Sequence, residues 1–407
     1  MAPVGSYESL MAAIQGGADS VYFGVEQLNM RARSAHNFST DDLKKIVSIA
    51  QEHGVKTYLT LNIVVFDHEM ELLHQIIDLA KAVGLSAVIA SDQAAILYAR
   101  KVGVEVHIST QVNITNTEAV RFYAQYAEVM VLARELSLDQ VSFIHDFIER
   151  EKITGPKGQL VQIEMFCHGA LCMATSGKCY LSLHQYNYSA NRGACLQGCR
   201  RKYLVTDKES GDELEIDNEY LLSPKDLKTV HFLNKMLDSG VRVFKIEGRA
   251  RSSDYVKTVV QCYNEALLAV LDGSFSQEKI ADWDNRMSKV FNRGFWDGYY
   301  LGQRTGEWTS SYGSSATHKK VYVGKSTNYF DKLGVAEFFL ESGSLKLGDE
   351  ILITGPTTGA VQLVIAEMRT ALNPVETALK GEAVSIPVAD KIRRNDKLYK
   401  LVPTKKE

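Results

Sequence analysis

The sequence predicts an α/β fold with two domains: a (βα)8, TIM-like barrel over residues 1–308 with an inserted cysteine-rich loop, and a small all-β barrel over residues 319–407. Short apolar, β-branched segments alternate with amphipathic helical segments about eight times in the first part, which predicts parallel strands joined by helical crossovers. From residue 319 onward, short alternating segments broken by turns favour a small closed barrel. A doubly wound open sheet is the second choice for the first domain.

The strands of the first domain are predicted from runs of apolar and β-branched residues. Their expected positions are Ala2–Val4, Ser20–Glu26, Lys56–Asn62, Ala87–Ser91, Val104–Thr110, Glu128–Ala133, Leu160–His168 and Val241–Gly248. Apolar residues at helical spacing predict helices at Asp42–His53, Asp67–Val83, Asn116–Ala127 and Leu138–Arg150. In a barrel of this order, the loops after the strands build the active site.

The second domain follows a polar segment, Thr309–His318, which is predicted to be a linker. The strands expected after it are Val321–Gly324, Leu333–Phe339, Glu350–Thr354, Ala360–Met368, Glu382–Pro387 and Lys397–Leu401. Glycine-containing pairs at 348–349 and 355–356 predict turns between them. The segment Leu347–Gly355 resembles the second domain of elongation-factor-type translation proteins, which implies an RNA partner.

Composition and charge exclude some classes of protein. The chain has 407 residues, of which 45% are apolar and 23% charged, as expected of a globular protein with one large and one smaller domain. It has no apolar run long enough to span a bilayer and no apolar signal segment after a basic start, so a cytoplasmic protein without membrane contact is expected. The net charge of −3 excludes a uniformly basic protein, so nucleic-acid binding would need a local patch.

Two basic segments are candidates for such a patch. One consists of Arg192, Arg200, Arg201 and Lys202, and the other is Lys391–Lys397. Contacts from lysine and arginine to phosphates would give an affinity that depends strongly on salt. A solvated charged surface is the simpler interpretation of either segment alone, but together with a translation-type barrel they favour RNA binding.

Polar residues follow several predicted strands and are candidates for a pocket. They are Asn62, Asp92, Gln111, Arg134, Glu135, His168, Lys245, Glu247 and Arg249. Because the carboxyl ends of barrel strands meet at one face, these side chains are expected to converge. Arg134, Arg192 and Arg249 are candidates for carboxylate recognition. Glu164 and His168 share one side of their strand by two-residue periodicity, and His168 is either a proton carrier or a core histidine.

The strongest signal is a cysteine-rich segment after the Leu160–His168 strand, which is too long for an ordinary βα connection. Four of the six cysteines follow a C-x6-C-x15-C-x3-C pattern: Cys172, Cys179, Cys195 and Cys199. Four thiolates suit either zinc or an iron–sulfur cluster, and buried free thiols are the alternative. The other two, Cys167 and Cys262, lie on a predicted strand and a predicted helix and are expected to be packing residues.

The same residues carry a family resemblance. The segments EMFCHGALCM (164–173), SGKC (176–179) and NRGAC (191–195) closely resemble the signature of peptidase family U32, and KIEGR (245–249) resembles its second motif. APVGS (2–6), GAD (17–19), VYFG (21–24) and STQ (109–111) also match, so the resemblance covers nearly the whole chain. Within the family, the pattern is most similar to the tRNA hydroxylation protein P branch, which converts the wobble uridine of certain tRNAs to 5-hydroxyuridine.

The resemblance implies a cofactor and partners. It assigns the four patterned cysteines as ligands of a [4Fe–4S] cluster, with zinc as the alternative. It implies tRNA as the substrate and prephenate, a small carboxylate, as a required metabolite; a paralogue or a second copy of the chain is the candidate protein partner. The residues then expected to be catalytic are Glu164, His168 and Glu247, and those expected to bind substrate are Arg134, Arg192, Lys245 and Arg249.

Other functions stay open at this point. Branches that hydroxylate a ribosomal-RNA cytidine or a quinone precursor are close, and a non-catalytic RNA-binding factor with structural zinc is a further alternative. The family was named for collagenase-like peptidases. However, the sequence has neither an H-E-x-x-H zinc motif nor a G-x-S-x-G nucleophile elbow. Cys167 and His168 are neighbours on a predicted strand and point to opposite faces, so they could not readily act as nucleophile and base.

Overall fold

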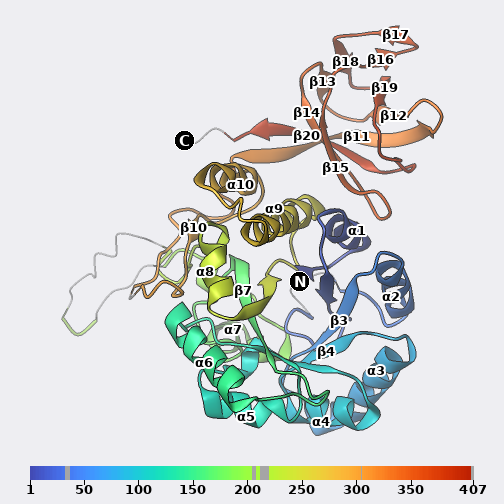
Figure 1. Cartoon of the computed structure of the whole chain (residues 1–407). Coiled ribbons are helices and arrows are strands. Elements are labelled where there is room, and N and C mark those ends of the chain that lie inside the picture. Colours follow the sequence, from blue (N-terminus) through green and yellow to red (C-terminus); the bar gives the residue numbers. More distant parts are fainter. Residues whose placement is uncertain (33–36, 204–207, 211–219, 304, 405–407) are drawn as a thin grey trace.

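The computed structural model describes residues 1–32, 37–203, 208–210, 220–303 and 305–404. It has an N-terminal part, in which helices surround a sheet, and a C-terminal part built of strands, which lies over α1, α9 and α10 (Figure 1). In the described residues, no helix combines the length and apolar character needed to cross a membrane.

The N-terminal sheet is parallel over most of its width. Its parallel strands are β1 (Ala2–Pro3), β2 (Ser20–Phe23), β3 (Lys56–Leu61), β4 (Ala87–Ala90), β5 (Val106–Ile108), β6 (Val129–Val131), β7 (Gln162–Ala170) and β9 (Val241–Ile246). β1 to β7 pair in sequence order, and β9 pairs with β7. The predicted α/β class and its parallel sheet are therefore confirmed.

The main chain of Met1, the residue just before β1, links the first strand of this run to β9, the last. Its amine donates to the carbonyl of Phe244 at 2.8 Å, and its carbonyl accepts from the amide of Ile246 at 3.1 Å. Both partners belong to β9. Complete closure into an eight-stranded barrel stays a prediction.

The sheet departs from simple βα alternation beyond β7. The last three residues of this strand, His168–Ala170, pair antiparallel with β8 (Asp226–Lys228), and β10 (Phe295–Trp296) pairs parallel with β8. Sequence analysis did not predict these strands, because two or three residues are too few to show a hydrophobic period. They lengthen the sheet on the side where the cysteine segment begins.

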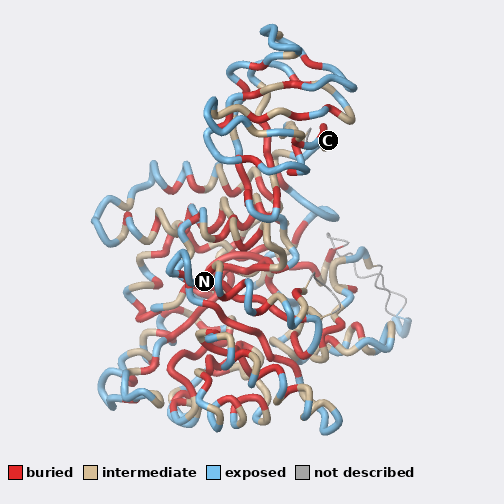
Figure 2. Tube along the Cα trace, turned by 90° about the vertical axis from the view of Figure 1, so that its right-hand side faces the viewer, coloured by how far each residue is buried: buried red, intermediate tan, exposed pale blue. Residues whose placement is uncertain are grey.

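Helices cover the outside of the sheet. They are α1 (Tyr7–Gln15), α2 (Asp42–Glu52), α3 (Met70–Ala82), α4 (Gln93–Val102), α5 (Thr117–Ala124), α6 (Leu138–Glu151), α8 (Leu233–Asp238), α9 (Ser253–Leu271) and α10 (Gln277–Lys289). Several begin at a side-chain cap: Ser6, Asp92, Asn116 and Ser137 each accept a hydrogen bond from a main-chain amide of the first turn. Each helix buries one apolar face, and the sheet between them is buried throughout most of its length (Figure 2).

The C-terminal part is an antiparallel sheet. Its strands are β11 (His318–Phe330), β12 (Val335–Leu340), β13 (Ser344–Lys346), β14 (Glu350–Gly355), β15 (Gly359–Val364), β16 (Arg369–Thr370), β17 (Asn373–Pro374), β18 (Thr377–Leu379), β19 (Ala383–Pro387) and β20 (Lys397–Pro403). Eight of them pair in the order β15-β14-β20-β11-β12-β19-β16-β17, and β13 pairs with β18. The six predicted strands are all present, and β13, β16, β17 and β18 are additional. A closed barrel stays a prediction for this part.

The two parts pack directly against each other. The side-chain amide of Gln15 in α1 donates to the carbonyl of Thr358 at 2.8 Å and accepts from the amide of Ala360 at 3.2 Å. Lys257 of α9 also donates to the carbonyl of Ala360, at 2.7 Å. Leu352 and Ala360 belong to the same buried apolar cluster as the N-terminal sheet. The C-terminal sheet is thus held over α1 and α9, away from the cysteine segment.

Candidate active site

A pocket of about 370 Å³ lies at the carboxyl edge of the parallel sheet. Residues in or just after seven strands line it: Tyr22, Thr60, Asn62, Ile89, Ser109, Gln111, Arg134, Phe166, Ala170, Lys245, Glu247 and Arg249. The cysteine segment covers it and contributes the remaining side. Parallel strands carry their carboxyl ends to one edge, so residues far apart in the sequence meet there as predicted.

All four patterned cysteines line this pocket. Cys172 is exposed, the other three are half-buried, and none forms a disulfide. They lie on short turns around α7 (Leu181–Tyr186) rather than on regular strands. The two cysteines outside the pattern, Cys167 and Cys262, are fully buried in the apolar core.

The four thiols affect each other electrostatically. Burial raises the pKa of Cys179 and Cys199, and the neighbouring cysteines raise it further because a second thiolate nearby is repelled. In the described part of the chain, no three His, Cys, Asp or Glu side chains are grouped closely enough to hold a single metal ion. The four thiols that line this pocket are of the donor type that an iron–sulfur cluster uses.

The cysteine segment is anchored on both sides by hydrogen bonds. Arg200 donates to the carbonyls of Leu171 and Pro224 at 2.6 Å each, and the hydroxyl of Ser182 accepts from the amide of Leu196 at 3.0 Å. Gly193 has a φ of 81°, and a Cβ there would overlap the carbonyl oxygen of Asn29. A glycine is therefore required where this segment crosses the β2–α2 connection.

Three guanidinium groups that line the pocket, those of Arg134, Arg200 and Arg249, have no carboxylate partner among the described residues. Arg249 is 7% exposed and donates to Asn29 Oδ1 at 3.1 Å and Thr60 Oγ1 at 2.9 Å. Its burial lowers the pKa of its guanidinium to about 10. Arg134 stacks on the ring of Phe166, 3.8 Å from its centroid, and its buried Nε has no acceptor in the described chain. Such groups favour an anionic ligand, because it would neutralise buried positive charge.

The acidic side chain of the pocket is Glu247, which is paired with Arg31 at 3.1 Å. Burial would raise the pKa of Glu247, but Arg31 and then Arg251 outweigh it and hold the pKa below its usual value. Sequence analysis missed Arg31. The signal that could have found it is the length of the 24–41 segment between β2 and α2, which exceeds an ordinary βα connection.

Below the pocket, three titratable residues meet inside the sheet. Lys245 Nζ lies 2.6 Å from Glu164 Oε1, and Glu164 Oε2 lies 3.6 Å from His107 Nδ1. All three side chains are buried. Lys245 lines the pocket, whereas Glu164 lies behind it and is not part of the pocket wall. Glu164 therefore acts on the pocket only through Lys245.

His168, predicted to be a site residue, lies outside the pocket. The pairing of β7 with β9 shifts register between Phe166 and His168, so the two-residue alternation that the prediction used does not extend to His168. This histidine is buried among Tyr255, Tyr263 and Phe295, and burial lowers its pKa to about 3. It occupies the position of a core histidine.

Arg192 lies on the outer side of the cysteine segment. Its guanidinium forms a two-pronged ion pair with Glu69, at 2.6 Å for each contact. Asp92 and Glu135 also lie outside the pocket: Asp92 caps α4, and Glu135 lines a neighbouring hollow. Among the polar residues predicted at strand ends, those that converge are Asn62, Gln111, Arg134, Lys245, Glu247 and Arg249.

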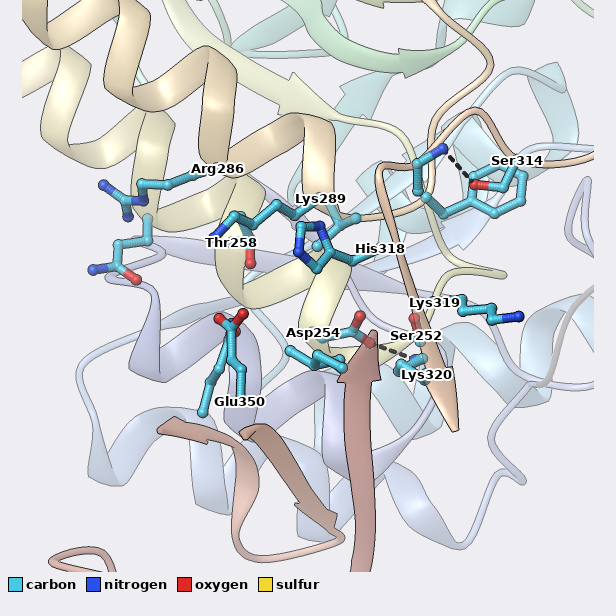
Figure 3. Close-up of a pocket in the computed structure, with 16 residues that line it drawn as sticks. Ser252, Asp254, Thr258, Arg286, Lys289, Ser314, His318, Lys319, Lys320 and Glu350 are labelled. Atoms are coloured by element: carbon cyan, nitrogen blue, oxygen red, sulfur yellow. Dashed lines mark hydrogen bonds and ion pairs between the residues drawn. The ribbon is translucent and has the colours of Figure 1, made fainter. Parts of the chain in front are cut away.

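A second pocket, of about 500 Å³, lies between α9, α10 and the C-terminal sheet (Figure 3). Asp254 of α9 and Lys320 of β11 pair across it at 2.7 Å. Arg286 of α10 is held by Glu265 at 2.6 Å. Since these charges are paired within the protein and no described cysteine lies there, this pocket is a junction between the two parts rather than a candidate active site.

The first pocket lacks the groups that peptide hydrolysis by a cysteine needs. Among the described residues that line it there is no histidine. A cysteine nucleophile requires a base within hydrogen-bond reach, most often histidine. The pocket instead combines four thiols with cationic side chains.

Comparisons with known proteins agree with the motifs. The model of the family described as Peptidase family U32 matches residues 5–310. A protein of Porphyromonas gingivalis (strain ATCC BAA-308 / W83) named "Collagenase" is 63% identical over 400 residues, covering 98% of this chain and 97% of its own length.

Several other relatives carry names of RNA-modifying proteins, among them one from Bacillus subtilis and one from Escherichia coli. The tRNA hydroxylation protein P1 of Bacillus subtilis (strain 168) is 32% identical over 367 residues, covering 88% of this chain and 83% of its own length. The 23S rRNA 5-hydroxycytidine C2501 synthase of Escherichia coli (strain K12) is 35% identical over 302 residues, with 72% of this chain and 44% of its own covered. The resemblance seen in the sequence is confirmed, and the chain belongs to peptidase family U32.

Proposed function

We propose that this protein is an RNA-modifying enzyme that hydroxylates the wobble uridine of tRNA to 5-hydroxyuridine, with an iron–sulfur cluster on Cys172, Cys179, Cys195 and Cys199 and with prephenate as a required metabolite. The observation that carries the proposal is the content of one pocket. It holds four free thiols together with guanidinium groups, among them those of Arg134 and Arg249, that have no carboxylate partner in the described chain. This combination suits redox chemistry beside an anionic ligand.

The cationic side chains bind the anionic ligand. Arg134 and Arg249 each present a planar donor group that fits a carboxylate in two-pronged fashion. Lys245 adds a third positive charge at the pocket floor, and Glu164 holds it in place at 2.6 Å. A small dicarboxylate such as prephenate would give Arg134 Nε, which is buried without an acceptor in the described chain, a partner.

The remaining polar groups bind and orient the base. The amides of Asn62 and Gln111 lie together in the pocket, with Asn62 Nδ2 3.1 Å from Gln111 Oε1, and amides can pair with the edge of a pyrimidine. Glu247, kept ionised by Arg31, is the pocket's acidic group and could accept a proton from the substrate.

The thiols supply the cofactor site. Replacing a C–H bond by C–OH is a two-electron oxidation, which needs an oxygen donor and an electron acceptor; an iron–sulfur cluster held by these thiols would supply electron transfer for it. Zinc on the same thiols would provide no redox chemistry. A pocket that must oxidise its substrate therefore favours the cluster over zinc.

The names of two relatives support hydroxylation of RNA, one on tRNA and one on ribosomal RNA. Either substrate would place the enzyme in the cytoplasm. The second candidate function is peptide hydrolysis, which the 63% identical relative named "Collagenase" favours. Against it stands a pocket without histidine in its described lining.

The test is mass analysis of nucleosides from tRNA and, separately, from ribosomal RNA, in a strain that lacks this gene and any paralogue. We expect 5-hydroxyuridine derivatives to disappear from tRNA and to return when the gene is restored. Loss of hydroxycytidine from ribosomal RNA alone would replace tRNA by ribosomal RNA as the substrate. Unchanged nucleosides, together with gelatin cleavage by the purified protein, would refute the proposal in favour of the peptidase.

A further inference from the structure

A groove of about 490 Å³ runs along the outer side of the cysteine segment, next to the active-site pocket. The residues that define it here are Val64, Phe66, Tyr188 and Arg192, and we call it the aromatic groove. No role has been given to it so far. Its position and surface chemistry both indicate a ligand.

The aromatic groove and the pocket are two sides of the same pair of chain segments. After β3, Asn62 faces the pocket and Val64 and Phe66 face the groove. In the cysteine segment, Cys195 faces the pocket and Arg192 faces the groove. The amide of Val64 donates to the carbonyl of Asn191 at 3.2 Å and joins the two segments. The groove and the pocket are therefore built on the same two joined segments.

The groove exposes the large apolar side chains of Val64, Phe66 and Tyr188. Phe66 is 49% exposed and Tyr188 is 41% exposed. The same cysteine segment also exposes Met173, Tyr180 and Leu196. Single exposed apolar residues are common, but several on one face beside a pocket mark an interaction surface.

Phe66 and Arg192 form a fixed platform. The guanidinium of Arg192 lies 4.0 Å from the centroid of the Phe66 ring. It is held there by Glu69 at 2.6 Å and by the carbonyl of Val64 at 2.6 Å. Because Glu69 neutralises its charge, Arg192 contributes here a flat, fixed surface rather than a free cation.

We propose that the aromatic groove receives an unpaired nucleobase of the RNA, next to the base that enters the pocket. This rests on the proposed function. An enzyme that acts on a base must take it out of its stack, and the neighbouring base then loses its stacking partner. Aromatic rings and arginine planes replace that partner in single-stranded RNA recognition.

The groove favours a base over a proline-rich peptide, which aromatic surfaces also bind. Asn187 and Asn191 place side-chain amides at its border, and these can pair with the edge of a base, whereas a proline ring offers no such edge. The adjoining pocket also presents guanidinium groups, which suit an anionic ligand. The proline and glycine residues of a collagen-like peptide carry no negatively charged side chain.

The experiment uses a tRNA anticodon stem-loop that carries 2-aminopurine beside the wobble uridine, titrated with the full-length protein. Stacking on an aromatic ring quenches 2-aminopurine, so the signal reports the proposed contact. We expect Phe66→Ala to abolish the quenching and to weaken binding about 5- to 100-fold, which corresponds to the loss of one stacked base. Phe66→Trp should keep both, because it preserves an aromatic face.

The matched control is Phe143→Ala, which removes a phenylalanine that is 66% exposed on α6, outside the groove. It should change neither quenching nor affinity. If Phe66→Ala behaves like this control, or if a proline-rich collagen peptide binds in a Phe66-dependent way while the RNA does not, the proposal is overturned. Phe66-dependent RNA binding without any hydroxylation would still support the groove, and would refute the proposed function instead.

Discussion

Lys245 Nζ lies 2.6 Å from Glu164 Oε1 on neighbouring strands, and both side chains are buried inside the sheet. The pair joins the pocket to the core, because Lys245 lines the pocket and Glu164 does not. His107 lies on the far side of Glu164, at 3.6 Å. The Glu164 carboxylate, which lies between Lys245 and His107, thus holds in place Lys245, the basic group that faces the pocket.

Replacing Glu164 should destabilise the fold strongly. Glu164→Gln leaves Lys245 buried without its counter-charge, and breaking a buried ion pair from one side costs about 3–5 kcal/mol. Urea denaturation measures the free energy of unfolding. The control is Glu118→Gln, which removes one partner of an exposed i,i+3 ion pair and should cost less than about 1 kcal/mol. Equal effects of the two substitutions would contradict the structural role of the buried pair.

The stabilisation by Glu164 should be lost in acid. Burial opposes ionisation, but Lys245 and then His107 lower the pKa of Glu164 from 4.5 to about 2. A carboxyl whose pKa is lowered by folding stabilises the protein above its unfolded pKa, and this stability is lost as the pH falls through the folded value. The difference in unfolding free energy between wild type and Glu164→Gln should therefore shrink as the pH falls from about 5 towards 2. A difference that grows in acid would show that the sign is wrong.

Gly193 should be needed for the cysteine segment to reach the pocket. Gly193→Ala places a methyl group against the carbonyl oxygen of Asn29, at a φ of 81°. Gly103→Ala is the control, since Gly103 has a φ of 83° and no atom near its Cβ direction. Both should lose about 1 kcal/mol from the left-handed backbone. Only Gly193→Ala should also lose bound iron after anaerobic purification, and equal iron contents would contradict the steric account.

Anion binding should depend on the planar shape of the Arg249 guanidinium and not only on its positive charge. Arg249→Lys keeps the positive charge but loses the planar guanidinium, whose Nη1 donates to both Asn29 and Thr60. We expect hydroxylation at limiting carboxylate metabolite to fall about 10- to 100-fold, as for the loss of one or two charge-assisted hydrogen bonds. Lys257→Arg, on α9 and outside the pocket, is the control and should change activity little. An active Arg249→Lys variant with unchanged demand for the metabolite would remove Arg249 from anion binding.

Much of this arrangement could be predicted from the sequence because it depends on local patterns. β-branched runs located the long parallel strands, and the order of strands placed Arg134, Lys245 and Arg249 at one edge. The spacing of the cysteines singled out the four that line the pocket.

What could not be predicted depends on contacts distant in sequence or on short irregularities. Arg31 reaches Glu247 from a connection with no periodic pattern, and a register shift in β7 carries His168 into the core. The strands β8 and β10 are too short to leave a hydrophobic period. Arg192 has the same residue type as Arg249, and only the fold shows that it pairs with Glu69 outside the pocket.

The central claim is that the four cysteines of the pocket hold the group that modifies RNA. The most direct measurement is the 5-hydroxyuridine content of tRNA from the deletion strain complemented with Cys195→Ala or with Cys262→Ala. Cys195 lines the pocket and Cys262 is a buried core residue, so the pair matches in chemistry and differs in place. We predict that Cys262→Ala restores the modified nucleoside and that Cys195→Ala does not. Restoration by Cys195→Ala, at a protein level equal to wild type, would contradict the account.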